Sequence, residues 1–417
     1  MLRITSLRFV FYSPEKSVVT QVRELSVSPS TNLSDLVLAL PEGNYKLVVI
    51  ANPTTKLVAR TAVGSPLSQL TGYEHYYTDE LATQGSQLTV SLLNEQGPVT
   101  VTSAAFSSTT PQVRIQLESV LARVLVYGEP RLAGGAKRGS APAGYVLSPQ
   151  ARYTAPLRPL GHLRTGGSEV AGDGSQPEDR YPTSRMCQEW KDSAPRSLTE
   201  LLSHFALDRM TSHEGGEDIY QARLLPDEQA LAAAVSNIHA YARETTLPPT
   251  AYLVGALPSL VIRFPYIPGG LTLRENEGWV SFRGKYYTES QMKEWIRSDD
   301  FDDSTLAEAV KAARINEDSF TAPFEKGDLR FYYRGYNYYV VPIRHFDDTK
   351  APTKTSIGRY GVVRGAEYRI RLTQILRPGT PVPPDLTADL TPVAEEKNVH
   401  AIVSVRPIVV HSSEIHI

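Results

Sequence analysis

The sequence predicts a mainly β protein that carries additional helices in its second half. Short runs in which apolar and polar residues alternate, separated by turn residues, are typical of strands in sandwiches. The chain has 417 residues, whereas one hydrophobic core is built by about 100–200 residues. We therefore expect two β-sandwich domains, residues 1–150 and 151–397, and a separate strand at 398–417.

Charge and cysteine content exclude several classes of function. The chain has 43 Lys and Arg against 45 Asp and Glu, so no basic surface for nucleic acid is expected. The single cysteine, Cys187, excludes an internal disulfide framework and a cysteine metal cluster. Arg3 and Arg8 interrupt the apolar N-terminal run, which therefore lacks the core of a signal peptide. We expect that an export signal was removed or never present.

The first half predicts a series of short strands. Leu7, Phe9 and Phe11 alternate with the residues between them, so the first strand should turn one face inward. The turn at 41–44, with a glycine, leads into a strand at 45–52. Further strands are predicted around 36–40 and at 86–93, 99–105, 113–117 and 121–127.

The second half predicts an α+β region after a stretch rich in Gly and Pro at 128–179. Helix is expected only between about 195 and 315. Thr288 and Gln291 have capping-box spacing and mark the start of one helix. The other helices are predicted at 197–205, 227–243 and 305–313, and strands at 250–257, 260–267, 279–287, 329–343 and 367–376. The strand at 329–343 should form a tyrosine-rich hairpin that turns at 334–337.

The C-terminal segment is the most informative part of the sequence. A proline-rich spacer at 378–392 should be extended and should keep the last strand from folding back. After it, Val399, Ala401, Val403 and Val405 alternate with other residues and give one apolar face. Because an unpaired apolar strand is an aggregation hazard, this strand must have an acceptor.

Candidates for catalytic or metal chemistry are weak. The motifs of hydrolases, nucleotide-binding proteins and zinc proteases are absent. His213 lies in a polar Gly-containing run that favours an exposed loop over a metal site. The acidic cluster at 299–303 lacks the spacing of a calcium loop and favours a solvated helix start. The tyrosines at 332–339 fit a sugar-binding platform or, preferably, core and cross-strand pairs. We predict no catalytic residue, metal or cofactor.

Several stretches resemble the FimA/Mfa-type (type V) pilins of Bacteroidia, most closely the shaft subunits of Porphyromonas short fimbriae. The N-terminal stretches are ITSLRFVFYS, LPEGNYKLVVIAN and VRIQLESVLARVLVYG. The C-terminal stretches are YYRGYNYYVVPIRHF, GRYGVVRGAEYRIRLTQILRPGTP and the ending AIVSVRPIVVHSSEIHI. The sequence departs from the family at Ile408, where a Trp is usual.

The resemblance implies two tandem transthyretin-like β-sandwiches in a non-enzymatic fimbrial subunit that polymerises by donor-strand exchange. Such a subunit is exported through the outer membrane to the cell surface, and an arginine-specific protease removes its first strand. The implied partners are other copies of the chain, anchor and tip accessory pilins, and host or bacterial surface receptors. The implied donor residues are Val399, Ala401, Val403, Val405, Pro407 and Val409, and Leu7, Phe9 and Phe11 belong to the implied acceptor strand.

Two other functions remain open at this point. A tip or accessory adhesin would bind a host protein or glycan, and it should lack a free donor strand. A secreted β-sandwich glycan hydrolase would need two carboxylates about 5–10 Å apart in a cleft.

Overall fold

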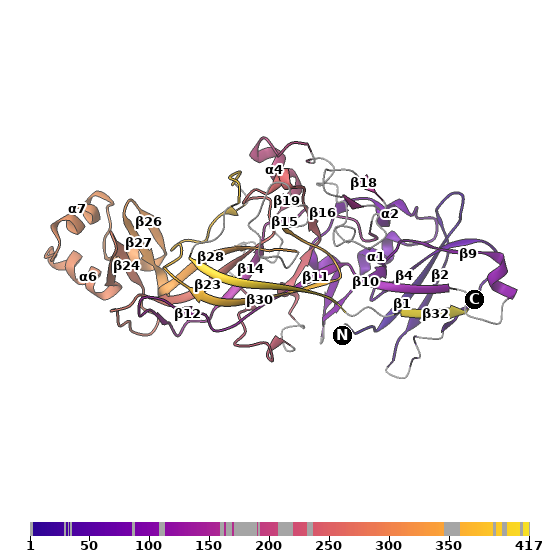
Figure 1. The fold of residues 1–417 in the computed structure, drawn as a ribbon, viewed down its shortest axis with the longest axis horizontal. Coiled ribbons are helices and arrows are strands. Elements are labelled where there is room, and N and C mark those ends of the chain that lie inside the picture. The colour runs from indigo at the N-terminus through magenta and orange to yellow at the C-terminus, as the bar shows by residue number, and fades with distance from the viewer. Residues whose placement is uncertain are drawn as a thin grey trace.

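The computed structural model is an elongated molecule with the N-terminal sheet at one end and a small inserted module at the other (Figure 1). It is mainly β with several antiparallel sheets, which confirms that part of the predicted fold class. It describes residues 3–28, 31, 33, 36–85, 88–107, 113–158, 162–163, 169–170, 190, 192–206, 220–231, 237–345, 359–386, 389–393, 398–408 and 412–416.

The first sheet contains eight strands and supports the first hydrophobic core. Its order is β2 (Val19–Ser26), β1 (Ser6–Tyr12), β4 (Tyr45–Ala51), β8 (Leu92–Asn94), β10 (Val113–Ser119), β32 (Ser412–His416) and β3 (Leu36–Val37), with β9 (Val99–Val101) on β4. β1 was expected to bury one face, but both faces are buried. Arg8 on the second face donates to Thr61, just after helix α1 (Thr55–Arg60), and pairs with Glu24.

Two further sheets enclose the second core. One contains β21 (Tyr241–Arg243), β11 (Leu121–Tyr127), β30 (Ala366–Ile375), β12 (Arg131–Leu132) and β31 (Val399–Pro407). The other contains β20 (Ala222–Arg223), β14 (Gly144–Ser148), β23 (Ser259–Ile267), β13 (Lys137–Arg138) and β28 (Tyr336–Pro342). Apolar side chains of both sheets meet between them. β11 and β14 precede residue 150, yet they belong to this core together with strands that follow residue 150. The division into domains at that residue therefore stays a prediction.

The inserted module (279–333) lies between β23 and β28, which pair with each other. Its sheet has the order β25 (Lys285–Thr288), β24 (Trp279–Phe282), β27 (Leu329–Tyr332) and β26 (Phe324–Lys326), with the helices α6 (Glu289–Ser298) and α7 (Ser304–Ala312) beside it. The predicted capping box is present, because Gln291 N–H donates to Thr288 Oγ1 and Thr288 N–H donates to Gln291 Oε1. The module has a core of its own, built from residues 280–333.

The remaining described elements are short. They are α2 (Ser68–Thr71), α4 (Leu198–His204), β5 (Glu74–His75), β6 (Ala82–Gln84), β7 (Leu88–Val90), β15 (Gln150–Ala151), β16 (Tyr153–Thr154), β17 (His162–Leu163), β18 (Glu169–Val170), β19 (Phe205–Ala206), β22 (Thr245–Thr246) and β29 (Gly361–Val362). Six 3-10 turns complete the described structure, at Thr78–Glu80, Ser103–Ser107, Ile238–Ala240, Pro249–Ala251, Glu317–Thr321 and Tyr333–Gly335.

Several predictions of secondary structure are wrong. Helix also occurs in the first half, as α1 and α2; the cap residue of α1 is Thr54, whose side chain accepts from the Leu57 N–H, whereas α2 has no side-chain cap. The helix predicted at 227–243 ends in a 3-10 turn and β21 instead, with 232–236 outside the described residues. Residues 250–257 form turns after two prolines rather than a strand. The predicted hairpin at 329–343 is split between two sheets, as β27 and β28.

Candidate strand-pairing site

The C-terminal segment (399–416) contributes one strand to each of two sheets. β31 runs antiparallel to β30 over nine paired positions, from Ile375 opposite Val399 to Ala366 opposite Pro407. Val399 and Val403 are buried in the second core, whereas Ile402 between them is 58 % exposed. Figure 1 shows β31 in yellow along β30, before the chain continues to the N-terminal end of the molecule. The predicted alternation of apolar and exposed residues is therefore present here.

β32 lies between two strands from the first third of the chain. It pairs antiparallel with β10, where Gln116 faces Ser412 and Val113 faces Ile415. On its other edge it pairs parallel with β3, where Leu36 also faces Ile415. The last strand of the chain therefore completes a sheet whose other strands all come from residues 6–119. We call the place between β10 and β3 the β32 slot.

The C-terminal segment passes from the second core to the first core at one residue, Ile408. Ile408 follows Pro407 directly, is 5 % exposed and packs in the first core. Its N–H donates to the carbonyl of Gly365, with an N to O distance of 2.7 Å. Gly365 has φ +70°, a left-handed conformation that glycine adopts without strain. Ile408 is thus anchored by its side chain and by its backbone.

Buried ion pairs surround this crossing point. Arg364 donates to Glu244 at 2.8 Å, and both side chains are buried. Arg158 donates through two nitrogens to Glu118, at 2.9 and 2.6 Å. Burial raises the pKa of Glu118 to about 7, although Arg158 opposes that shift. Since charges removed from water must be paired, these contacts hold the polypeptide around Gly365 in one arrangement.

His345 also lies in this buried region. Its Nδ1 is 2.8 Å from the hydroxyl of Tyr368 on β30. Burial lowers the pKa of His345 to about 4, against a smaller opposing effect of Glu244. The imidazole is therefore neutral at pH 7 in the folded protein.

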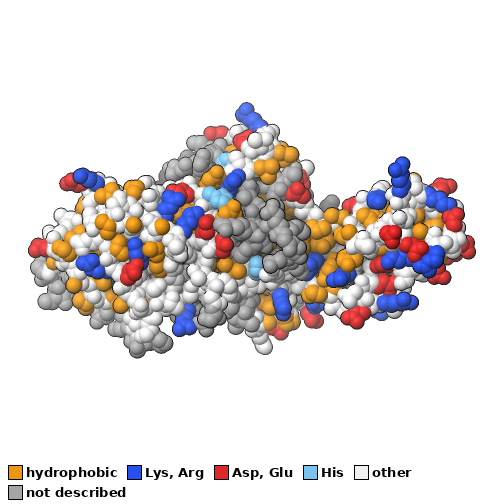
Figure 2. Space-filling model, turned by 180° about the vertical axis from the view of Figure 1, so that it is seen from behind, with side chains coloured by type: hydrophobic (Ala, Val, Ile, Leu, Met, Phe, Trp, Pro, Cys, Tyr) orange, Lys and Arg blue, Asp and Glu red, His pale blue; other side chains and the backbone are white. Residues whose placement is uncertain are grey.

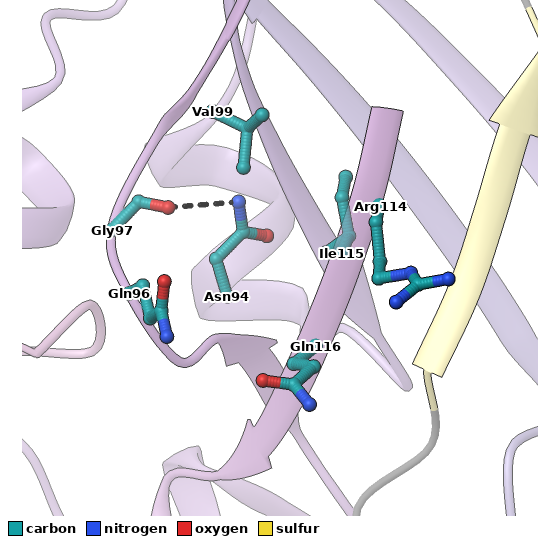
Figure 3. Close-up of a pocket in the computed structure, with 7 residues that line it drawn as sticks. All are labelled: Asn94, Gln96, Gly97, Val99, Arg114, Ile115 and Gln116. Carbon is teal, nitrogen blue, oxygen red and sulfur yellow. Dashed lines mark hydrogen bonds between the residues drawn. The ribbon is translucent and has the colours of Figure 1, made fainter. Parts of the chain in front are cut away.

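The edge of β10 opposite β32 borders a hollow of about 320 Å³ (Figure 3). The connection between β8 and β9 diverges from β10 at this place. One backbone hydrogen bond joins the two, in which Glu95 N–H donates to the Gln116 carbonyl at 2.9 Å. Gln96, Val99 and Arg114 line the hollow. In Figure 3, β10 separates it from the yellow strand β32. Among the described strands, the first half of β10 therefore pairs with β32 alone.

The proline-rich spacer does not keep the last strand away from the body, contrary to the prediction. Thr380 and Tyr338 bond to each other through both backbone groups, at 3.0 and 3.1 Å. Val254 N–H donates to the Thr391 carbonyl at 2.9 Å, and Leu386 is buried. The spacer lies against the body of the protein, because its carbonyls accept from Tyr338 on β28 and from Val254 in a loop. The C-terminal segment therefore returns to its own chain.

The structure brings together only some of the predicted site residues. Val399, Ala401 and Val403 face the second core of their own chain. The backbones of Val405 and Pro407 pair with β30; their side chains and Val409 lie outside the described part. Leu7, Phe9 and Phe11 lie on β1, whose two edges are already paired with β2 and β4. No local pattern in the sequence identifies β10 or β3 as the neighbours of the last strand, although VRIQLES in β10 does alternate.

The other candidates have structural roles where they are described. Asp303 caps α7 and pairs with Lys285 at 2.9 Å, and its bonds to Lys285 and Thr305 hold its pKa below the usual range. Tyr332 stacks on Trp279 and is buried, which fits a core role. His239 belongs to a 3-10 turn, while His213 and Cys187 lie outside the described residues. Within the described residues, no three acidic, His or Cys side chains are grouped as metal ligands, and no helix is long and apolar enough to cross a membrane.

These features define a class of β-rich protein in which a terminal strand completes a sheet built by a distant part of the fold. Residues 330–414, which contain β28, β30 and β31, match the family model described as "Major fimbrial subunit protein type IV, Fimbrillin, C-terminal". This region is therefore similar to the C-terminal part of fimbrillin, which agrees with the resemblance found in the sequence over the same residues. No curated protein is significantly similar to the chain in sequence.

Solved structures of fimbrial proteins align over nearly the whole chain at low identity. The fimbrilin FimA of Porphyromonas gingivalis W83 has 14% identity and a TM-score of 0.40, over 97% of this chain and 91% of that chain. The tip fimbrial protein Mfa3 of Porphyromonas gingivalis, with C-terminal truncation, has 8% identity and a TM-score of 0.40, over 97% and 94%. Both TM-scores are below 0.5, so neither alignment adds to the family match.

Proposed function

We propose that this protein is a structural subunit of a bacterial surface fimbria that polymerises by strand exchange and serves adhesion, biofilm formation and colonisation. In the polymer, the last strand of one subunit fills the β32 slot of another. Other copies of the chain are the main partners, and accessory anchor and tip pilins would end the filament. The fimbrillin match at residues 330–414 supports this class of function.

One observation carries the proposal: β32 lies between β10 and β3 and pairs with both, although it is distant from both in the sequence. An element held in this way can be exchanged between identical chains, since the same contacts form in both arrangements. Strand addition supplies main-chain hydrogen bonds for affinity and side-chain register for specificity. Insertion into the same chain competes with exchange because the tethered strand has a high effective concentration.

Removal of residues 412–417 tests this proposal. We expect the truncated protein to be folded but monomeric, because its slot is empty and it has no strand to donate. Electron microscopy and light scattering of the concentrated protein measure assembly. A synthetic peptide of residues 408–417 is the matched control, which should raise the melting temperature of the truncated protein without producing filaments. Filaments of normal length from the truncated protein would show that the proposal is wrong.

A further inference from the structure

We propose that exchange is confined to β32, while β31 and Ile408 remain in their own subunit. This inference rests on the proposed function and concerns which part of the C-terminal segment is donated. The donor region implied by the sequence, Val399 to Val409, would then be mostly a permanent part of the subunit that carries it.

The two strands of the segment differ in how firmly they are held. β31 has nine paired positions with β30 and places Val399 and Val403 in the second core. β32 has four paired positions with β10 and two with β3. Removing β31 would expose its buried valines and leave β30 without a neighbour on that edge. Release of β32 alone breaks fewer contacts and is therefore the more accessible opening.

Ile408 marks the boundary between the retained and the exchanged parts. Its side chain is buried in the first core and its N–H is bonded to Gly365. The ion pair between Arg364 and Glu244 fixes the backbone beside that glycine. The chain before this point is therefore anchored in both cores, whereas the described contacts of the strand after it are its pairs with β10 and β3 in the slot.

The length of the tether limits how two subunits can lie. Four residue steps separate Ile408 from Ser412, and each extended step spans at most about 3.6 Å, which gives a reach of about 14 Å. If Ile408 stays in its own core, the β32 slot of the acceptor must lie within that distance of it. The proposal thus requires the first sheets of neighbouring subunits to be adjacent, and it excludes a long donor strand that spans a whole subunit.

Disulfide trapping between different molecules tests the confinement. Gln116 faces Ser412 across the slot, and Arg371 faces Ile402 across β30 and β31. In a Cys187→Ser background, protein with Gln116→Cys is mixed with protein carrying Ser412→Cys, assembled and oxidised. A matched mixture combines Arg371→Cys with Ile402→Cys, both exposed positions. Opposed strand positions lie close enough for a disulfide. Covalent dimers are counted by non-reducing electrophoresis.

We expect up to about half of the first mixture to become covalent dimers, because a cross-link needs a Ser412→Cys donor in a Gln116→Cys acceptor, and we expect the second mixture to give none above an unassembled sample. If both mixtures cross-link, or only the second, β31 is exchanged as well and the confinement is wrong, while the proposed function stands. If neither cross-links although filaments form, strand exchange itself is wrong, and with it this inference. Circular dichroism of each single variant before mixing establishes that it is folded.

Discussion

The inserted module and the C-terminal segment are stabilised in opposite ways. The module has a core whose buried residues all lie between 280 and 333, while Trp279 and Tyr332 on its β24 and β27 pack in the second core. The C-terminal segment makes all its strand pairs with residues from elsewhere in the chain, as far away as β3. Local contacts close short loops and form readily, whereas distant strand pairing carries a large entropy of loop closure. The module should therefore be an independent unit of stability, and the C-terminal segment should depend on two others.

The exposed charged side chains of the module also pair with one another, as expected of an independent unit. In Figure 2 the module forms the right-hand end, where acidic and basic side chains lie side by side. Several of them are paired, as in Lys311 with Asp299 at 2.9 Å and Arg297 with Glu317 at 2.6 Å. Exposed pairs of this kind contribute little to stability because water and salt screen them, so the module depends chiefly on its apolar core.

The largest expected effect comes from Phe331→Ala, which removes a fully buried ring from the module. Truncation of a buried aromatic side chain costs about 3–5 kcal/mol. Because the buried residues of the module's core all lie between 280 and 333, hydrogen exchange should accelerate there and stay unchanged in β31. Arg330→Ala is the matched control on the same strand, since its pair with Glu325 is exposed. Faster exchange throughout the protein would mean that the module is not independent.

Val403→Asp should destabilise the second core by about 3 kcal/mol, because it places an unpaired charge in a buried position. Ile402→Asp is the matched control on the adjacent residue, which is exposed, and it should change the free energy of unfolding by less than about 0.5 kcal/mol. Urea unfolding measures both. Equal effects of the two substitutions would contradict the orientation of β31.

Lowering the pH from 7 to 5 should weaken the region around β30 and β31 through His345. The unfolded chain takes up a proton near pH 6.5, whereas burial lowers the pKa of His345 to about 4 in the folded protein. Below pH 6.5 the unfolded state therefore binds more protons, and the free energy of unfolding falls by about 2 kcal/mol by pH 5.

Comparison with His345→Gln isolates this effect from the other titrating groups, including Glu118. The difference in unfolding free energy between wild type and variant should shrink as the pH falls. The protection of the module against hydrogen exchange should not follow it. A difference that is constant between pH 7 and 5 would show that His345 is not responsible.

The contrast between local contacts and distant strand pairing also explains which elements could be predicted from the sequence. Thr288 was identified as a helix start because a capping box needs only residues three positions apart. The alternation of β31 was also readable, since it depends on one strand. The strands that pair with β32 could not be predicted, because β10 and β3 are hundreds of residues away in the sequence. Their pairing depends on the strand register in the folded protein.

Residues 250–257 show the other kind of failure. They have the composition of a strand, but Gly255 donates its N–H to the Asp389 carbonyl of the spacer, at 2.7 Å. A side chain at Gly255 would meet the Asp389 and Leu386 carbonyl oxygens at 2.6 Å. Close approach of a distant segment therefore determines the local structure, and no local pattern in the sequence reports it.

The dependence of β10 on β32 also has a consequence for the order in which the protein is made. A chain is synthesised from its N-terminus, and its early parts generally fold first. The first sheet, however, receives one of its inner strands from residues 412–416. Until those residues emerge, the first half of β10 is open on the β32 side, where β32 of a finished chain can pair with it. A prematurely terminated chain would keep that edge open, and this would distinguish it from a finished subunit.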